Sequence, residues 1–167
     1  MSVGPGFWAF STALYGQDGV KTACLDVQAA GLDVNVALFA AWAVITGRDP
    51  GPVMGEVLSR AALWRASVVQ KLRDARDQLK PAPDFIDTDA ALQLRQTILK
   101  AELEAERLQQ AALEPLISAC PARRGPGRRG EVRAHLSQAA SEVGAGPGAD
   151  TAIERFVEII FSTLENV

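Results

Sequence analysis

Residues 54–79 read MGEVLSRAALWRASVVQKLRDARDQL, and their apolar side chains recur at steps of three and four. That spacing predicts one long amphipathic helix, which Pro81 and Pro83 then end. A second stretch with the same spacing follows residues 87–89, which offer candidate N-caps. We therefore predict an antiparallel hairpin of two helices, each about 40 Å long at 1.5 Å per residue, as the scaffold of the fold. The two predicted seams are Met54, Val57, Ala61, Trp64, Val68, Leu72, Ala75 and Leu79 on the first helix, and Ala91, Leu94, Ile98, Ala101, Ala105, Leu108 and Ala112 on the second.

The bend of this hairpin fixes its register. If it is centred near residues 83–85, the numbers of paired residues sum to about 169. Trp64 then lies opposite Ala105, so a large side chain meets a small one. The same register brings Arg65 near Glu104.

Short helices precede the hairpin, and glycines separate them. The spacing predicts helices over 7–15, 19–30 and 33–47, the first two ended by Gly16 and Gly31. Asp33 is placed to cap the third helix, which is apolar almost all round and is therefore expected at the centre of the fold. Together with the C-terminal segments, this predicts an all-α fold of six to seven helices.

The composition changes after Cys120. Residues 121–130 are rich in Gly, Pro and Arg, with Arg123, Arg124, Arg128 and Arg129 making them basic, and they are interpreted as a linker. The linker divides a helical core domain, 1–120, from a C-terminal helix pair, 131–167. The last helix carries an apolar stripe that we expect to dock on its own domain or on a second copy. This candidate interaction surface comprises Ile153, Phe156, Val157, Ile160, Phe161 and Leu164.

Composition narrows the possible partners. The chain has 167 residues and a formal charge of −3. This charge argues against nucleic acid as a partner, because such binding depends on neutralised phosphates. The longest apolar run, residues 36–45, is about half of the ~20 residues that span a bilayer. No signal-peptide pattern opens the sequence, so we expect a cytoplasmic protein that does not span a membrane. As partners we expect another protein or a second copy of the chain.

Few residues of the sequence are candidates for catalysis or metal binding. His135 is the only histidine, and Cys24 and Cys120 have no redox or zinc spacing. We therefore predict no catalytic residue, no metal site and no cofactor, with two buried thiols and a solvated His135. A candidate pocket between the short helices and the hairpin would be lined by Asn35, Trp42, Trp64, Arg65 and Glu102. The alternative is that the tryptophans are packing anchors and that the charges form salt bridges along the hairpin.

Three motifs resemble a family. They read FWxFSxALY over 7–15, GVxxACLxxQ over 19–28 and GxDVNxxLFxxW over 31–42. Together with Trp64 and looser matches in the hairpin, this pattern resembles a proteobacterial family of short proteins of unknown function, from Phe7 to about Leu116. The resemblance implies a helical cytoplasmic protein but no activity. We interpret the chain as a non-catalytic interaction or adaptor protein; the alternative is a small-molecule binder or enzyme that uses the candidate pocket.

Overall fold

The computed structural model describes residues 6–123, 125 and 127–165, so Arg124 and Pro126 of the predicted linker lie outside the described residues. Within this part the fold is all-helical, as predicted, and contains no strand. One isolated antiparallel bridge pairs Arg48 with Ala122. The helices are α1 (Phe7–Tyr15), α2 (Val20–Ala29), α3 (Val34–Ile45), α4 (Met54–Trp64), α5 (Gln70–Gln78), α6 (Thr88–Leu113), α7 (Arg129–Glu142) and α8 (Ala149–Glu165).

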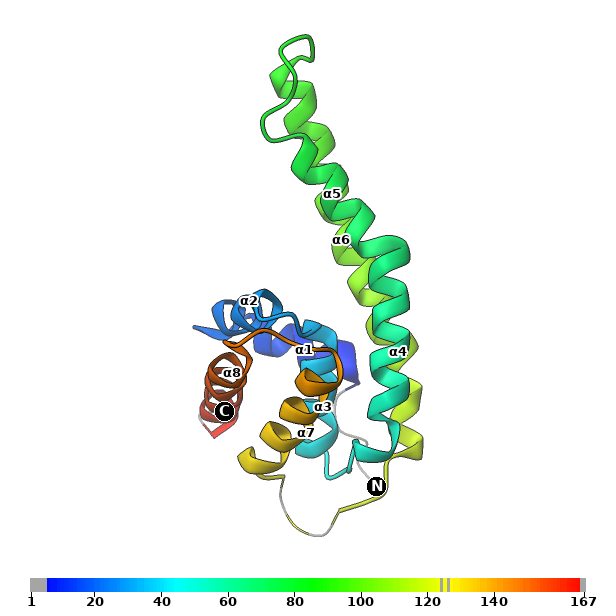
Figure 1. Ribbon diagram of the computed structural model, residues 1–167, viewed down its shortest axis with the longest axis vertical. Coiled ribbons are helices and arrows are strands. Elements are labelled where there is room, and N and C mark those ends of the chain that lie inside the picture. The colour runs from blue at the N-terminus through cyan, green and yellow to red at the C-terminus, as the bar shows by residue number, and fades with distance from the viewer. Residues whose placement is uncertain (1–5, 124, 126, 166–167) are drawn as a thin grey trace.

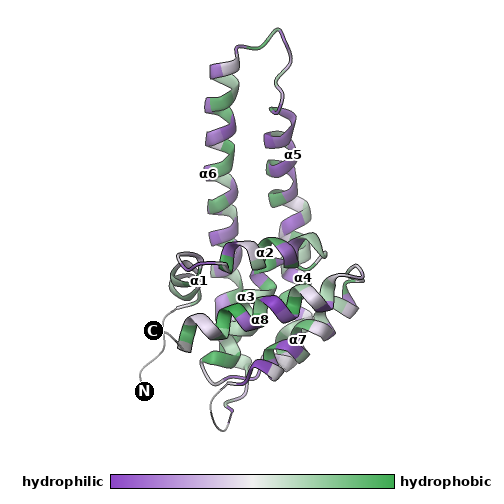
Figure 2. Cartoon of the chain, turned by 90° about the vertical axis from the view of Figure 1, so that its left-hand side faces the viewer, coloured by the Kyte–Doolittle hydropathy of each residue, from purple (hydrophilic) through white to green (hydrophobic). Residues whose placement is uncertain are grey.

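The long hairpin forms an arm that stands on a base of shorter helices (Figure 1). One side of the arm is α4, a π-helical turn over Arg65–Val69, and α5, and the other side is α6. Because α4, the π turn and α5 follow one another without a break, they count as one continuous helix. The described residues then form seven helices, as predicted. Figure 2 shows α5 and α6 side by side above α1, α2, α3, α7 and α8.

Helix α3 lies at the centre of the base, as its composition predicts. Every residue from Asn35 to Val44 is buried. Phe39 and Trp42 of α3 pack on Phe7 of α1, with ring centroids 5.8 Å and 5.2 Å from that of Phe7. Trp42 is therefore a packing anchor of the core.

The C-terminal helices complete the same core. Helix α8 packs on α2 and α7, and α7 packs on α3. Ile153, Phe156, Val157 and Ile160 are buried in one cluster with the side chains of α1 to α3, while Phe161 and Leu164 pack partly buried against it. We expected this stripe to pack either on its own domain or on a second copy, and it packs on its own domain. The stripe is thus covered and does not form an open surface for another protein.

The segment before α7 lies against the end of α3. The N–H of Arg123 donates to the carbonyl of Gly47 over 2.8 Å, and its guanidinium pairs with Glu131. Gly127 lies so close to Val44 that a Cβ would fall 2.4 Å from the Val44 carbonyl oxygen. This contact explains why a glycine is needed there.

The register of the arm confirms the predicted pairing of Trp64 with Ala105. The indole Nε1 of Trp64 donates to the carbonyl of Ala105 over 2.9 Å, and Ala105 is buried. Parts of the predicted apolar seams are wrong, however. Four seam residues of α6 and one of α5 are exposed: Leu94, Ala101, Leu108, Ala112 and Ala75.

Polar residues occupy part of the contact face of α6 instead. Glu102 and Gln109 are 4% exposed. Glu102 pairs with Arg76 and Arg73 of the other side of the arm, whereas Gln109 bonds to Asn35 and Asp33 at the start of α3. Apolarity alone therefore misjudges the seam, because a polar side chain with a partner can be buried there.

The predicted ion pair between Arg65 and Glu104 is absent. Glu104 accepts instead from Arg107 of its own helix, with 2.8 Å between Nε and Oε2. Side chains three residues apart on one helix are neighbours, so this ion pair forms within α6 and does not depend on the distance between the two helices.

We expect Ala105→Leu to lower the free energy of unfolding by about 1 to 3 kcal/mol, because the larger side chain must displace the Trp64 indole that packs there. Urea denaturation would measure this loss. Ala101→Leu, an identical change at an exposed site of α6, is the control and should leave stability within about 0.5 kcal/mol. Equal effects of the two changes would contradict the register.

Candidate functional site

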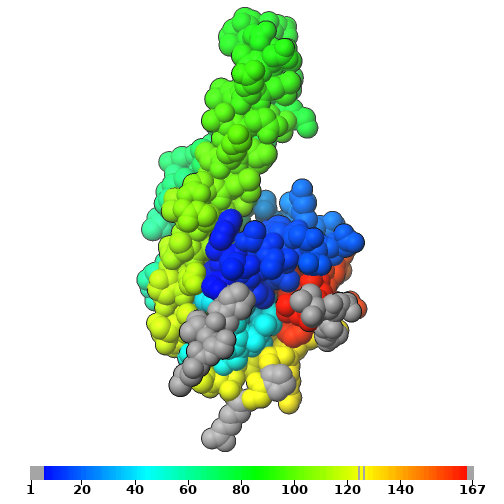
Figure 3. All heavy atoms as spheres, turned by 180° about the vertical axis from the view of Figure 1, so that it is seen from behind, coloured from blue at the N-terminus to red at the C-terminus, as the bar shows by residue number. Residues whose placement is uncertain are grey.

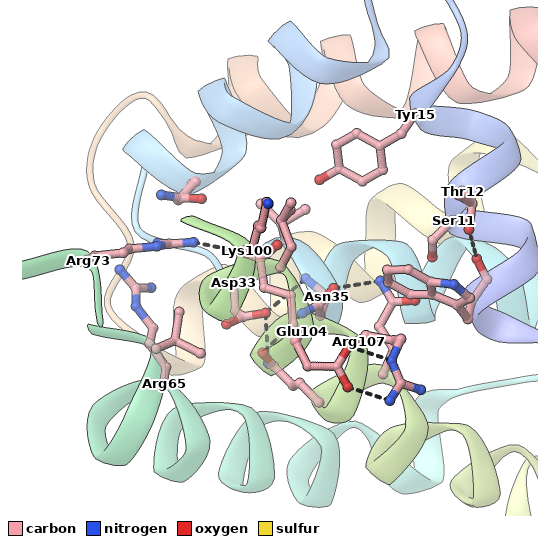
Figure 4. Close-up of a pocket in the computed structure, with 18 residues that line it drawn as sticks. Ser11, Thr12, Tyr15, Asp33, Asn35, Arg65, Arg73, Lys100, Glu104 and Arg107 are labelled. Carbon is pink, nitrogen blue, oxygen red and sulfur yellow. Dashed lines mark hydrogen bonds and ion pairs between the residues drawn. The ribbon is translucent and has the colours of Figure 1, made fainter. Parts of the chain in front are cut away.

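A cleft of about 520 Å³ opens in the corner between the arm and the base. Figure 4 shows its walls: α1 contributes Ser11, Thr12 and Tyr15, and the arm contributes Arg65 and Arg73 on the other side. Lower α6 and the start of α3 lie between them. The full lining is Trp8, Ser11, Thr12, Tyr15, Gln28, Asp33, Val34, Asn35, Arg65, Val69, Arg73, Lys100, Leu103, Glu104, Glu106, Arg107, Gln109 and Gln110.

The π turn helps to shape the arm side of this cleft. A π-helical turn closes its hydrogen bonds between residues five apart, so it is wider than an α-helical turn. Arg65, Val69 and Arg73 follow one another at steps of four, a spacing that keeps side chains on one face of a helix, and all three line the cleft. Single π turns are frequent at functional sites.

The cap of α3 positions the floor. Asp33 accepts the backbone N–H of Asn35 over 2.8 Å and of Val36 over 3.3 Å, which confirms its predicted role as N-cap. The cap fixes the first turn of α3, and Asn35 lies in that turn. Its side chain is therefore held against α6 at the bottom of the cleft.

A relay of amide side chains runs along this floor. Gln110 Nε2 donates to Asn35 Oδ1 over 2.7 Å, and Asn35 Nδ2 donates to Gln109 Oε1 over 3.0 Å. Gln109 Nε2 in turn donates to Asp33 Oδ1 over 3.2 Å. The three amides are at most 7% exposed, so each depends on its neighbour for partners.

Two buried polar atoms of the cleft lack a partner. Ser11 Oγ and Gln110 Oε1 make no hydrogen bond, and their residues are 1% and 3% exposed. An unpaired buried polar group costs about 1 to 3 kcal/mol. A ligand that reaches these atoms would recover that cost.

The charges of the cleft are only partly paired. Arg73 pairs with Glu106 over 2.9 Å, and Arg107 pairs with Glu104, which lowers the pKa of that carboxyl. Arg65 and Lys100, by contrast, make no ion pair with any residue in the described part of the chain. Two cations are thus left to face an incoming group.

A second hollow, of about 660 Å³, adjoins the cleft and shares Arg65, Arg73 and Leu103 with it. Here Glu102 lies 3.1 Å from Arg76 and 3.8 Å from Arg73. Burial raises the pKa of Glu102, although both arginines act to lower it.

The hollow also contains Cys24 and Tyr15. Burial raises the pKa of the Cys24 thiol to about 11, and burial together with the neighbouring Cys24 raises the pKa of Tyr15. Both groups therefore stay protonated at neutral pH, which makes the thiol a poor nucleophile.

The five residues of the sequence-predicted pocket separate in the structure. Asn35 and Arg65 line the cleft, and Arg65 and Glu102 line the adjoining hollow. Trp42 belongs to the core of the base, and Trp64 points into the hairpin, so neither tryptophan lines these spaces.

Sequence reasoning missed Trp8, Ser11, Tyr15, Gln109 and Gln110. The adjacent glutamines offered a signal, because Gln109 follows Glu102 by seven residues and so lies on the same face of α6. The α1 residues offered none, since only the packing of α1 against α6 brings them to the cleft.

His135 is half-buried, contrary to the expected solvated position, and lies outside the cleft. Its Nε2 is 3.3 Å from Asp49 Oδ1. Burial lowers its pKa and Arg123 lowers it further, while Asp49 acts in the opposite direction.

A histidine with a lowered pKa gives a definite pH dependence. The unfolded chain takes up a proton near pH 6.5, and the folded chain resists it. Stability should therefore be complete above about pH 6.5 and fall below it, by at most about 1.4 kcal/mol per pH unit. Urea denaturation at pH 7.5, 6.5 and 5.5 should show a shallower decline for His135→Gln. An equal decline in both proteins would contradict this assignment.

No group of three or more His, Cys, Asp or Glu side chains that could hold a metal ion occurs in the part of the chain described. None of the described helices is long and apolar enough to cross a membrane.

Comparisons with known proteins give a family and no activity. No curated protein matches the chain, and no solved structure matches it. Residues 6–113 match the family described as protein of unknown function (DUF2390), and these 108 of 167 residues include α1 to α6 and every residue of the cleft. The chain therefore belongs to this family of proteins of unknown function.

Proposed function

We propose that the chain is a non-catalytic interaction protein and that the cleft binds an acidic peptide segment with a large apolar side chain. The observation that carries this proposal is the pair of unpartnered buried atoms, Ser11 Oγ and Gln110 Oε1. Gln110 Oε1 can only accept a hydrogen bond, whereas the Ser11 hydroxyl can also donate one. A peptide backbone supplies the matching groups, an N–H and a C=O, next to each other.

The walls suit the side chains of such a segment. Trp8 is 42% exposed at the rim, and Leu103 is 54% exposed, so both offer apolar surface to a bound aromatic or aliphatic group. Arg65 and Lys100 have no carboxylate partner among the described residues and lie beside this surface. Acidic residues that flank the apolar side chain would pair with them.

The thiol, phenol and imidazole groups favour binding over catalysis. General acid–base and nucleophilic catalysis need groups that change protonation or react near neutral pH. Cys24 and Tyr15 are held protonated, and His135 lies elsewhere. The small-molecule alternative would use the same cleft and is an outcome of the experiment below.

Fluorescence anisotropy with a labelled hexapeptide, Glu-Glu-Phe-Leu-Glu-Glu with blocked ends, tests the proposal. We expect saturable binding to one site. Arg65→Gln should weaken it about 3- to 10-fold through loss of one charge contact. Leu103→Asp should abolish it, because a carboxylate at the apolar wall repels the acidic peptide.

Arg133→Gln is the matched control, because Arg133 is an exposed arginine of α7 that pairs with Glu154 away from the cleft. It should leave the affinity unchanged. Binding that Arg133→Gln weakens as much as Arg65→Gln would show a non-specific charge effect. Absence of peptide binding, with saturable binding of an apolar carboxylate such as a short fatty acid that Leu103→Asp removes, would favour the small-molecule alternative.

A further inference from the structure

The outer half of the arm lacks a core of its own. Between residues 70 and 101 only Ala91 is buried, and α5 has no buried residue. Figure 3 shows this part standing clear of the base. Two helices alone bury little apolar surface, and a stable helical layer usually packs against another.

One face of α6 carries an apolar stripe along this unsupported part. Leu92, Leu99 and Leu103 are exposed by 50%, 36% and 54%. Their spacing of seven and four places them in line on one side of the helix. The stripe runs from near the tip of the arm into the cleft, where Leu103 forms part of the wall.

The tip of the arm has the chemistry that the cleft is proposed to bind. Phe85 is 86% exposed at the turn between α5 and α6. Asp84, Asp87 and Asp89 surround it, and none of these carboxylates makes an ion pair within the described residues. The tip is thus an acidic segment with a protruding aromatic side chain.

We propose that two copies of the chain pair their arms in antiparallel fashion, so that the tip of each copy occupies the cleft of the other. This inference rests on the proposed function and names a second copy as the partner. The contact is reciprocal, as a twofold interface requires. It covers the leucine stripe of both arms and brings the acidic tip of each copy to Arg65 and Lys100 of the other.

The spacing between the tip and the cleft along the arm agrees with this antiparallel pairing. If Phe85 of one copy lies opposite Leu103 of the other, paired residue numbers sum to 188, and the twofold axis passes near Leu94. From Thr88, where α6 begins, to Leu103 the helix rises about 23 Å at 1.5 Å per residue, and this length separates the tip from the cleft along each arm. In the same register Lys100 faces position 88 of the second copy, between Asp87 and Asp89. Charge and apolar contacts are therefore satisfied together.

Complementary charge reversal tests the dimer. One full-length variant carries Asp84→Lys and Asp89→Lys at the tip, and the other carries Arg65→Glu and Lys100→Glu in the cleft. Asp87 is left unchanged because it caps α6. Light scattering coupled to size-exclusion chromatography should show a dimer for the wild type and a monomer for each variant alone. An equimolar mixture should again form dimers, because each tip then meets a cleft of opposite charge.

Phe85→Ser provides a variant that does not depend on charge. The side chain is exposed, so the fold should be unaffected, while the dimer dissociation constant should rise at least about 30-fold on loss of an aromatic anchor. Circular dichroism melting curves would establish that each variant folds.

Three results would overturn the inference: a wild-type monomer at 100 µM, dimers that persist in Phe85→Ser, or folded charge variants that fail to pair when mixed. The hexapeptide, titrated into the Phe85→Ser chain so that no tip competes for the cleft, separates this failure from failure of the proposed function. A monomeric chain whose cleft still binds the hexapeptide would overturn the dimer alone, whereas loss of both would overturn the cleft as a binding site.

Discussion

A chain that ends at Cys120 is expected to lose cooperative unfolding. Removing α7 and α8 exposes the faces of α2 and α3 that they cover. Leu136, Ile153, Phe156 and Ile160 are each no more than 1% exposed, and each contributes roughly 1.5 to 3 kcal/mol by burial. Their sum is comparable with the whole stability of a typical domain, about 5 to 15 kcal/mol. Denaturation followed by tryptophan fluorescence would show the loss of the transition.

A graded version of this experiment uses single substitutions in α8. Phe156→Ala should lower the free energy of unfolding by about 3 to 5 kcal/mol. Glu158→Ala, at an exposed position of the same helix, should change it by less than about 0.5 kcal/mol. A shortened chain that melts at the temperature of the full chain would contradict the shared core.

Asn35→Ala is expected to lower the free energy of unfolding by about 2 to 5 kcal/mol. Asn35 is the middle of the amide relay, so its loss leaves Gln109 Oε1 and Gln110 Nε2 without partners in a buried site. Each unpaired buried group costs about 1 to 3 kcal/mol. Urea denaturation at pH 7.5 would give the difference.

The control replaces the whole relay by apolar residues of similar shape: Asn35→Leu, Gln109→Met and Gln110→Met together. Because no buried amide is then left unpaired, this triple variant should recover most of the stability. Its affinity for the hexapeptide should nevertheless be lower than that of the wild type, because the acceptor Gln110 Oε1 has been removed. A single Asn35→Ala variant as stable as the wild type would show that the relay contributes nothing to the fold.

The helices and the register of the arm follow from local signals in the sequence. Asp33 and Pro83 mark a helix start and a chain turn, and the pairing of Trp64 with Ala105 follows from the position of that turn. The central place of α3 follows from its composition. These features could be predicted because each depends on residues near in sequence or on one regular repeat.

The cleft could not be predicted in the same way. It forms where α1 meets α6. Contacts between segments that are so far apart in the sequence produce no repeating pattern of residues that a single sequence would show. Trp42 and Trp64 are large and suggested a pocket, yet the first fills the core and the second pairs with the Ala105 carbonyl. The π turn over Arg65–Val69 also could not be predicted from a period of 3.6 residues, although Arg65 and Val69 line the cleft.

Nuclear magnetic resonance of the Phe85→Ser chain, titrated with the acidic hexapeptide, tests the central claim most directly. In this chain the cleft is free of a second copy, and the cross-peaks of side-chain amides and indoles report on it. We expect the largest shifts at the amides of Gln110 and Asn35 and at the indole of Trp8, with the Trp42 indole unmoved. Shifts that gather on α7 and α8, or no shifts at all, would contradict it.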